Sequence, residues 1–518
     1  MQTSASERKP LLRISNLKQY FPLKKKGLYV KANDGITLDI YEGETLGLVG
    51  ESGCGKSTLG RTLLQLYRQT DGRTMYYGRS LEELAPKYVG KTYKTLEKRI
   101  KQQKQLRAKY KALKAEADAL ADGAAKYAKQ NDAEHARKDA DDAFLDLVNL
   151  IGGFFKVEDV SAVKTLYIKS YNIAAKKYKE AQKMASARLD LADATFQVET
   201  KKKADENAAA EEKKAAKCQN KIDQIQKRID AFQAELDAVH QEIDALRKPY
   251  ADDEEFQKLE SYRDDGVDLA RLTYPEIRLL RADLQMIFQD PYSSLNPRMT
   301  VGQIISEGMK AHKMFKRSDE RLQDAVIKVM EDAGLQAYFI HRYPHQFSGG
   351  QRQRIGIARS LAVQPKFVVC DEAVSALDVS IQSQIINLLK DLKEQQNLTY
   401  MFITHDLSVV KYISDRIGVM YLGNIVELAN SQTLFDHPLH PYTEALMNAI
   451  PTTDVDSERE MQVLEGDIPS PVRPPQGCKF HTRCKYCTEI CKHMVPQWEE
   501  VEPDHFVACH HYLGKAEE

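Results

Sequence analysis

The stretch GESGCGKST, from Gly50 to Thr58, decides the fold of this chain of 518 residues. It matches the pattern G-x-x-x-x-G-K-[ST] between an apolar run, Thr45 to Val49, and the helical run LGRTLLQLY. Glycines let such a loop wrap its backbone N–H groups around phosphates at a helix N-terminus. The Lys56 amine can then reach the outer phosphates, and the Ser57 hydroxyl can ligate Mg²⁺. The sequence therefore predicts an α/β domain that binds a nucleotide through Gly50, Glu51, Ser52, Gly53, Cys54, Gly55, Lys56, Ser57 and Thr58.

A second signal is FVVCDE, Phe367 to Glu372, where an apolar strand ends in two carboxylates. Ligands bind at the carboxyl ends of the strands in open parallel sheets. There Asp371 would hold Mg²⁺ through water, and Glu372 would polarise the attacking water as a general base. By itself an Asp-Glu pair after a strand is more often a helix cap beside an exposed acid. Together with the upstream loop, the pair favours nucleotide chemistry.

The third signal is FSGGQ, Phe347 to Gln351, at the start of the amphipathic helix RQRIGIARSLA. The Ser348 hydroxyl and the N–H groups of Gly349 and Gly350 offer a second cradle for phosphate. The segment resembles the signature motif of the ABC ATPases, and other motifs of that family occur in the same order. The resemblance implies that Ser348, Gly349, Gly350 and Gln351 contact the nucleotide.

Further positions take their roles from this resemblance. Gln289 in MIFQDPY resembles the Q-loop glutamine, and Asp378 closes SALD, which resembles the D-loop. His405 in FITHD resembles the switch histidine that contacts the γ-phosphate, and Phe21 lies where the family has its adenine-stacking aromatic. The resemblance thus implies that Glu372 and His405 are catalytic, and that Ser57, Gln289 and Asp371 hold magnesium.

The family resemblance also implies how the site is completed. Two such domains sandwich two ATP molecules head to tail, so that each signature loop completes the phosphate-binding loop of its partner. This chain has a single phosphate-binding loop, and we therefore expect it to pair with a second ATPase subunit, as a heterodimer, or with itself. Closure around ATP and reopening after hydrolysis would supply a mechanical stroke.

Longer strings give a narrower resemblance. FQDPYSSLNPRMTVG, DRIGVMYLGNIVE and HPLHPYTEAL resemble the F-type ATP-binding subunit of bacterial dipeptide and oligopeptide importers, over roughly residues 11 to 78 and 272 to 511. This implies an ATP-hydrolysing subunit that powers peptide import, bound peripherally to the cytoplasmic face of the bacterial membrane. Its expected partners are the second ATPase and two transmembrane permease subunits, with an extracellular substrate-binding protein acting indirectly.

Residues 81 to 270 have a different composition. No proline lies between Pro86 and Pro249, and apolar residues recur in steps of three and four from Ile222 to Leu246. That spacing is typical of a left-handed coiled coil, and a similar seam begins at Leu96. We expect one antiparallel hairpin that projects on the order of 70 Å. The apolar stretch from Ala143 to Phe155 would pack its distal end or, alternatively, dock another protein.

The predicted fold class is α/β: a P-loop, ABC-type nucleotide-binding domain interrupted by this helical coiled-coil hairpin, with a small Cys-rich tail that binds metal. The predicted division is residues 11–80 for the first part of the ATPase domain and 81–270 for the insertion. Residues 271–435 form the second part of the ATPase domain, and residues 436–518 form the tail.

The tail contains the spacing C-x5-C-x6-C-x17-C. The resemblance to importer subunits implies a 4Fe-4S cluster held by four thiolates. Cys487 forms a C-x2-C pair with Cys484 that would also suit zinc, and free thiols are the third alternative. The expected cluster ligands are Cys478, Cys484, Cys491 and Cys509.

Charge and hydropathy limit the other functions. Lys and Arg number 75 and Asp and Glu number 75, which gives no support for a nucleic-acid partner. We find no secretory signal and no apolar run of membrane-spanning length. The alternative function is a coiled-coil ABC ATPase of the chromosome-maintenance or DNA-repair kind. In those proteins the coil separates the Q-loop from the signature, whereas here it ends before Gln289.

Overall fold

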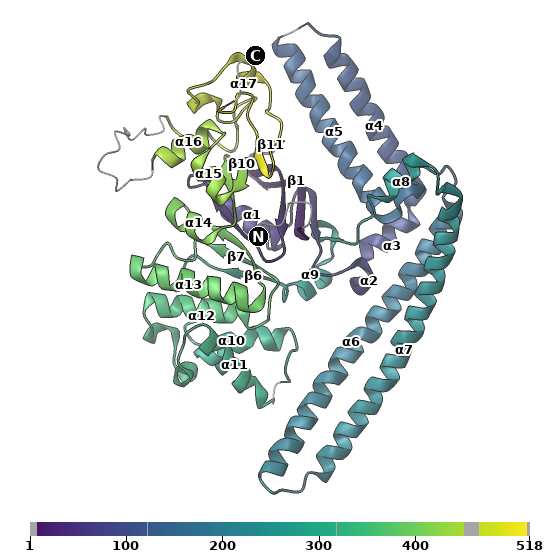
Figure 1. Cartoon of the computed structure of the whole chain (residues 1–518), viewed down its shortest axis with the longest axis vertical. Coiled ribbons are helices and arrows are strands. Elements are labelled where there is room, and N and C mark those ends of the chain that lie inside the picture. Colours follow the sequence, from purple (N-terminus) through teal and green to yellow (C-terminus); the bar gives the residue numbers. More distant parts are fainter. Residues whose placement is uncertain (1–7, 122, 317–318, 450–465, 515–518) are drawn as a thin grey trace.

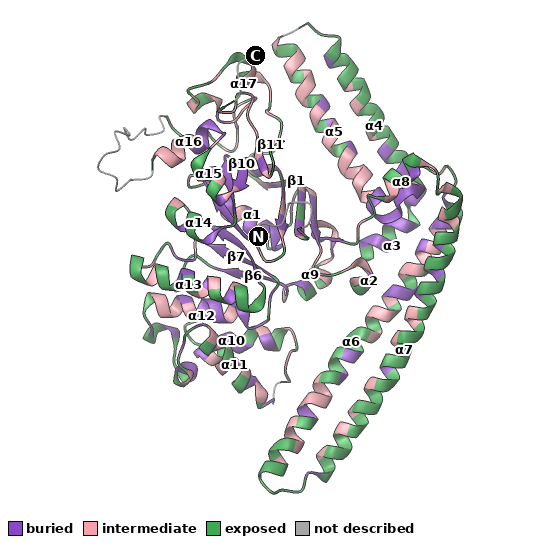
Figure 2. Cartoon of the chain, in the orientation of Figure 1, coloured by how far each residue is buried: buried purple, intermediate pink, exposed green. Residues whose placement is uncertain are grey.

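The computed structural model describes residues 8–121, 123–316, 319–449 and 466–514. Two long helical arms project from a mixed α/β body, one beside the C-terminal tail and one along the opposite end of the body (Figure 1). Burial is concentrated in the strands of the body, whereas the arms are mostly exposed (Figure 2). Within these described residues, no helix combines the length and apolarity needed to cross a membrane.

The body contains two sheets. An eight-stranded sheet has the order β11-β12-β10-β9-β3-β8-β7-β6, and a four-stranded sheet has the order β2-β1-β4-β5. In the first part of the chain the strands are β1 (Pro10–Pro22), β2 (Tyr29–Tyr41), β3 (Thr45–Val49), β4 (Asp71–Tyr76), β5 (Val267–Asp268) and β6 (Leu284–Ile287). The later strands are β7 (Phe367–Asp371), β8 (Thr399–Ile403), β9 (Arg416–Tyr421), β10 (Asn424–Asn430), β11 (Glu499–Glu502) and β12 (His505–Val507).

The middle of the large sheet is parallel and brings the chemical motifs to one edge. Strand β3 lies between β8 and β9 and runs parallel to both, and β7 runs parallel to β8 and β6. All five residues of β3, β7 and β8 are buried, as expected for strands covered on both faces. Their carboxyl ends therefore point the same way, toward the loops that carry the predicted site.

Helices cover the sheets and form a separate helical subdomain. That subdomain, α10, α11 and α12, has its own apolar core around Ile305, Met330 and Ile355, each fully buried. The helices of the body are α1 (Lys56–Leu63), α9 (Tyr274–Leu280), α10 (Val301–Ala311), α11 (Arg321–Asp332), α12 (Gly349–Leu361), α13 (Val379–Gln396), α14 (Leu407–Ile413), α15 (Ser431–Asp436), α16 (Pro441–Asn448) and α17 (Glu489–His493).

The inserted helices leave and rejoin the small sheet at neighbouring strands. Strand β4 precedes the insertion and β5 follows it, and the two pair antiparallel through Met75–Asp268 and Tyr76–Val267. A long insertion at such a point leaves the rest of the sheet intact, which is why it costs little. Its helices are α2 (Leu81–Leu84), α3 (Lys87–Lys94), α4 (Leu96–Asp118), α5 (Ala124–Ile151), α6 (Ser161–Lys203), α7 (Ala209–Arg247) and α8 (Glu254–Glu260).

The insertion forms two helical pairs, so the expectation of one hairpin is wrong. Helix α4 packs against α5, and α6 packs against α7 (Figure 1). The chain turns between the pairs at Gly152, whose φ of +55° favours glycine. The seam from Ile222 to Leu246 thus meets α6 and not α4. A heptad seam specifies that a helix has a partner, but it does not specify which helix that partner is.

The apolar stretch from Ala143 to Phe155 lies at the root of the arms and not at a distal end. Phe154 is 1% exposed and meets Phe256 edge-on, with ring centroids 5.4 Å apart. A Cβ on Gly153 would approach the Phe256 ring to 2.5 Å, so a side chain there would displace that ring. These residues therefore belong to the core that joins both arms to the body.

Candidate nucleotide site

The phosphate-binding loop connects β3 to α1 with the geometry that its glycines require. Gly55 has a φ of +105°, and a Cβ there would meet the Ala32 carbonyl oxygen at 2.1 Å. The Lys56 amine is 5% exposed and donates hydrogen bonds to the carbonyl oxygens of Gly50, at 2.7 Å, and Glu51, at 3.1 Å. The ammonium is thus held within the loop, where a bound phosphate would be.

The residues expected at magnesium meet beside this loop. The Ser57 hydroxyl donates to Asp371 Oδ1 at 2.5 Å, and Arg61 Nη2 lies 3.2 Å from Asp371 Oδ2. Asp371 is 1% exposed, and Arg61 partly balances its charge. A hydroxyl and a carboxylate oxygen in contact at a phosphate loop are the ligand types that Mg²⁺ uses in nucleotide sites.

The expected general base, Glu372, lies between Gln289 and His405, each of which follows the end of a neighbouring strand. Gln289 Nε2 donates to Glu372 Oε2 at 2.7 Å, and His405 Nδ1 lies 3.7 Å from Glu372 Oε1. Glu372 has a φ of +48°, a left-handed conformation that is uncommon outside glycine and clusters at functional sites. The structure therefore brings Gln289, Glu372 and His405 together from the ends of β6, β7 and β8.

A pocket of about 340 Å³ joins the loop to the base and to the aromatic side chain expected at adenine. Phe21 lines this pocket and meets Tyr67 edge-on, with ring centroids 5.2 Å apart. Its other lining residues are Val30, Lys31, Ala32, Ser52, Gly53, Gly55, Lys56, Ser57, Thr58, Glu372, Leu422, Gly423 and Pro471. An aromatic ring, the phosphate-binding loop and a carboxylate thus line one concave pocket.

The signature residues and Asp378 lie outside this pocket. Ser348 caps α12: its hydroxyl accepts from the Gln351 N–H at 3.4 Å, and its own N–H donates to the Gln351 side chain at 3.1 Å. Ser348, Gly349 and Asp378 are exposed, whereas Gly350 and Gln351 are half-buried. These residues therefore do not line the pocket, and three of them are exposed on the surface of this chain.

Two family models match the chain. The model described as "ABC transporter" matches residues 33–150 and 255–375, and the model described as "Oligopeptide/dipeptide transporter, C-terminal region" matches residues 426–491. The oligopeptide transport ATP-binding protein AppF of Bacillus subtilis is 51% identical over 252 residues, which are 48% of this chain and 75% of that protein. The chain belongs to the family of ABC transporter ATP-binding proteins.

Other relatives of this ABC ATP-binding protein also match slightly less than half of the chain. A putative peptide import ATP-binding protein of Brucella ovis is 54% identical over 245 residues, 47% of this chain and 77% of that protein. The oligopeptide transport ATP-binding protein OppF of Salmonella typhimurium is 53% identical over 237 residues, 45% of this chain and 70% of that protein. The unmatched gap of the ABC transporter model, residues 151–254, contains α6 and α7.

One contact of the ABC phosphate loop joins it to the distant C-terminal tail. Glu51 is held by Arg483 of the tail through two hydrogen bonds, of 2.8 and 3.0 Å, and the Glu51 N–H donates to the Tyr442 hydroxyl at 3.0 Å. The Arg483 side chain is 4% exposed. The side chain of Glu51 thus ties the loop to the tail. No local pattern signals this, because the paired residues are 432 positions apart.

The four expected cysteine ligands gather in the tail of this ABC protein. The Cys478 N–H donates to the Cys491 carbonyl oxygen at 2.8 Å. Burial, together with the neighbouring thiols of Cys509, Cys491 and Cys484, raises the pKa of Cys478 to about 12. Burial likewise raises the pKa of Cys509 to about 12, with Cys484 and Cys491 again nearby. In the described ranges, however, no group of three or more His, Cys, Asp or Glu side chains is arranged to hold a metal ion.

Proposed function

We propose that this ABC ATPase powers the import of peptides across the bacterial cytoplasmic membrane from a peripheral position on its cytoplasmic face. The observation that carries the proposal is the single site in which Lys56, the Ser57–Asp371 pair and Glu372 meet. Relatives that are 51% and 53% identical are named as oligopeptide transport ATP-binding proteins. We also propose four parts of the chain: the first part of the ATPase domain, the insertion, the second part of the ATPase domain and the tail. They span residues 11–80, 81–270, 271–435 and 436–518.

The side chains at the site have separable tasks. Lys56 stabilises the outer phosphates, and Ser57, Asp371 and Gln289 hold or orient Mg²⁺. Glu372 accepts a proton from the attacking water, while His405 senses or stabilises the γ-phosphate. The exposed signature loop at Ser348 serves the ATP of a second subunit, which we propose to be a different ATPase.

Exposed aromatic side chains on the helical subdomain and on the segment before it suit the permease subunits. Tyr292 and Tyr338 are 67% and 65% exposed, which is unusual for side chains of this size. Arg352 lies over the Tyr292 ring, 5.1 Å from its centroid, and donates to the Pro344 carbonyl oxygen, so the segments around residues 292 and 344 are neighbours. Aromatic residues supported by arginine are typical of binding hot spots. An extracellular binding protein would act only through the permease.

The proposal is tested by purifying this chain with its partner ATPase and permease in lipid vesicles. Addition of the binding protein loaded with peptide should raise the rate of phosphate release over the rate with the unloaded binding protein. A peptide-independent rate in an intact, membrane-inserted complex would contradict peptide import. The chromosome-maintenance alternative is not favoured, because the insertion rejoins the sheet at β5, before Gln289.

We further propose a 4Fe-4S cluster in the tail. Support comes from the spacing of the four cysteines and from the hydrogen bond between the Cys478 N–H and the Cys491 carbonyl oxygen, which holds two of the proposed ligands side by side. When bound, the group would supply folding free energy to a tail with little apolar core.

Replacing Cys491 tests this proposal directly. Purified anaerobically, the wild-type chain should contain about four irons and four sulfides, and the Cys491→Ser variant should contain far fewer. The measurement is iron, sulfide and zinc content together with the absorption spectrum. Cys218→Ser, in α7, is the matched control. Zinc alone or no metal in the wild-type protein would contradict the proposal.

We also propose that α6 and α7 form a coiled-coil arm that braces the helical subdomain. Lys316, before α11, lies 2.8 Å from an Asp190 oxygen and 3.3 Å from an Asp193 oxygen, both on α6. Arg321 lies over the Phe196 ring, 6.0 Å from its centroid. The arm thus links the insertion root to the subdomain that carries the signature loop, and it would oppose rotation of that subdomain during closure.

Charge reversal tests the brace. Partly exposed ion pairs contribute about 1 kcal/mol to stability, which corresponds to a factor of about five in an equilibrium constant. Lys316→Glu should therefore shift the equilibrium toward the released subdomain by about five-fold. Basal ATP turnover should rise by up to about five-fold. Phosphate release measures the effect. Adding Asp190→Lys and Asp193→Lys should restore the wild-type rate, while Lys310→Glu, exposed on α10, should leave it unchanged. Equal rates in all four proteins would contradict the proposal.

A further inference from the structure

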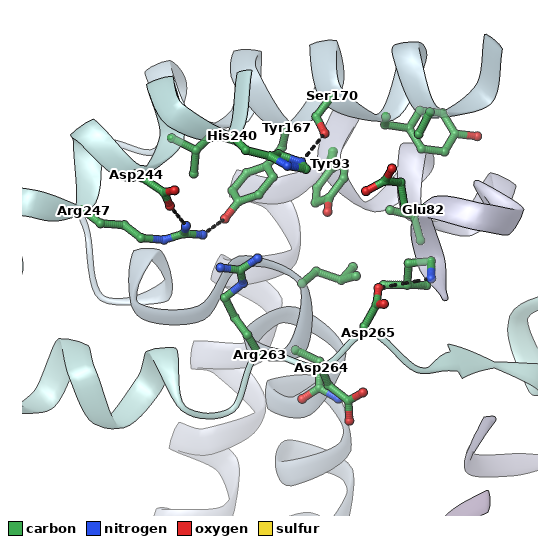
Figure 3. Close-up of a pocket in the computed structure, with 17 residues that line it drawn as sticks. Glu82, Tyr93, Tyr167, Ser170, His240, Asp244, Arg247, Arg263, Asp264 and Asp265 are labelled. Atoms are coloured by element: carbon green, nitrogen blue, oxygen red, sulfur yellow. Dashed lines mark hydrogen bonds and ion pairs between the residues drawn. The ribbon is translucent and has the colours of Figure 1, made fainter. Parts of the chain in front are cut away.

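A pocket of about 430 Å³ lies at the root of the second arm, away from the nucleotide site (Figure 3). Its walls come from α2 and α3, from the end of α5, from the facing sides of α6 and α7, and from the segment 263–265 that leads back to β5. This volume lies in the range of small-molecule sites. The enzymatic and transport roles proposed above do not use any of its residues.

The charges of the pocket are separated in space. In Figure 3 the guanidinium groups of Arg247 and Arg263 lie on one side, with the Asp244 carboxylate beside Arg247, and the carboxylates of Glu82 and Asp265 lie on the other. The rings of Tyr93 and Tyr167 stand between them, stacked with centroids 5.0 Å apart. A cationic end, an anionic end and an apolar middle therefore line one cavity.

Among the residues that the structure describes, part of the Arg263 guanidinium has no hydrogen-bond partner. Arg247 is occupied, because it pairs with Asp244 and Glu260 and donates to the Tyr167 hydroxyl at 3.3 Å. Arg263 donates through Nη1 to Glu260 at 2.9 Å, while its guanidinium extends into the pocket. A planar guanidinium with a free edge is suited to bind a carboxylate through two hydrogen bonds.

The anionic end lacks a cation of its own at Asp265. Glu82 accepts from Lys177 at 2.6 Å, whereas Asp265 accepts only the Leu81 N–H, at 3.2 Å, among the side-chain contacts that the structure gives for it. Partial burial raises the pKa of the Asp265 carboxyl, and the neighbouring acids Glu82 and Asp264 raise it further. An ammonium group placed beside Asp265 would relieve this repulsion.

We propose that this pocket binds a small zwitterion, either a short peptide or a free amino acid, with its carboxylate at Arg263 and its ammonium group at Asp265. The apolar wall of Tyr93, Tyr167 and Ile243 would receive the side chain. The inference stands apart from the proposed function, because it rests on the charges of this pocket and not on what the transporter moves.

Calorimetric titration of the full chain with alanylalanine, phenylalanine and alanine tests the inference. At least one should bind saturably, and the best ligand distinguishes a peptide site from an amino-acid site. N-acetylation and C-terminal amidation of that ligand should each weaken binding at least ten-fold, because each removes one charge. These capped ligands keep the test valid even if a variant fails to fold.

Two variants locate the site. Arg263→Gln should weaken binding of the free ligand at least ten-fold but leave the affinity for the amidated form unchanged, and Asp265→Asn should show the same pattern with the acetylated form. Lys56→Ala should bind the zwitterion as the wild type does. No saturable binding, or binding that neither capping nor either pocket variant weakens, would overturn the inference while leaving ATP hydrolysis and peptide import untouched.

Discussion

Replacing Glu372 by Gln should lower the turnover of ATP by on the order of 10²- to 10⁴-fold, the usual contribution of a general base. Glutamine keeps the size of the side chain and its contact with Gln289 but cannot accept a proton from water. The affinity for ATP should stay close to that of the wild type, because Lys56, Ser57 and Asp371 are unchanged. Phosphate release and nucleotide titration measure the two quantities separately.

Glu394→Gln, exposed on α13, is the matched control for this substitution and should hydrolyse ATP at the wild-type rate. The Glu372→Gln variant also tests whether the chain pairs with a second ATPase subunit. With hydrolysis blocked, ATP should hold the closed pair together, so that the complex elutes as a larger species with ATP than with ADP. Wild-type turnover in Glu372→Gln would show that another group activates the water, and would remove Glu372 from the mechanism.

Replacing Lys56 by Ala should nearly abolish ATP binding. Its ammonium is buried and held by the carbonyl oxygens of Gly50 and Glu51, within the loop that we propose to bind the phosphates. Loss of one partner from a buried charged pair costs about 3 kcal/mol, which corresponds to about a hundred-fold weaker affinity. Titration with a fluorescent ATP analogue measures this affinity directly.

Lys258→Ala, exposed on α8, is the control and should bind the analogue normally. Thermal unfolding without nucleotide distinguishes lost binding from lost folding, since both proteins should then unfold at a similar temperature. An unchanged affinity in Lys56→Ala would mean that this loop does not bind the phosphates, and the pocket lined by Phe21 and Glu372 would lose its assigned ligand.

The placement of the candidate site residues could be anticipated because each of their motifs is short and attached to a strand end. The glycines around Lys56 specify a loop by their backbone freedom, and the acids after Phe367–Asp371 lie where a parallel strand must end. Strand order then brings Gln289, Glu372 and His405 together, because β6, β7 and β8 are neighbours in one sheet. The order of these strands is therefore the only long-range feature needed to explain why the three side chains meet.

The arrangement of the arms could not be anticipated, because it depends on contacts between helices that are far apart in the sequence. Periodicity from Ile222 to Leu246 describes one face of one helix, and several helices in the insertion offer a similar face. The turn at Gly152 and the packing of Phe154 on Phe256 decide that α5 ends at the root. The contact between Glu51 and Arg483 depends on the same kind of long-range packing.

The most direct test of the central claim is accumulation of a labelled tripeptide in vesicles that contain this chain, its partner ATPase, the permease and the binding protein. ATP supplied on the side of the ATPases should drive uptake against a gradient with the wild-type chain. The same vesicles with Glu372→Gln should take up little peptide. ATP hydrolysis without peptide uptake by the wild type, or undiminished uptake with Glu372→Gln, would contradict the account.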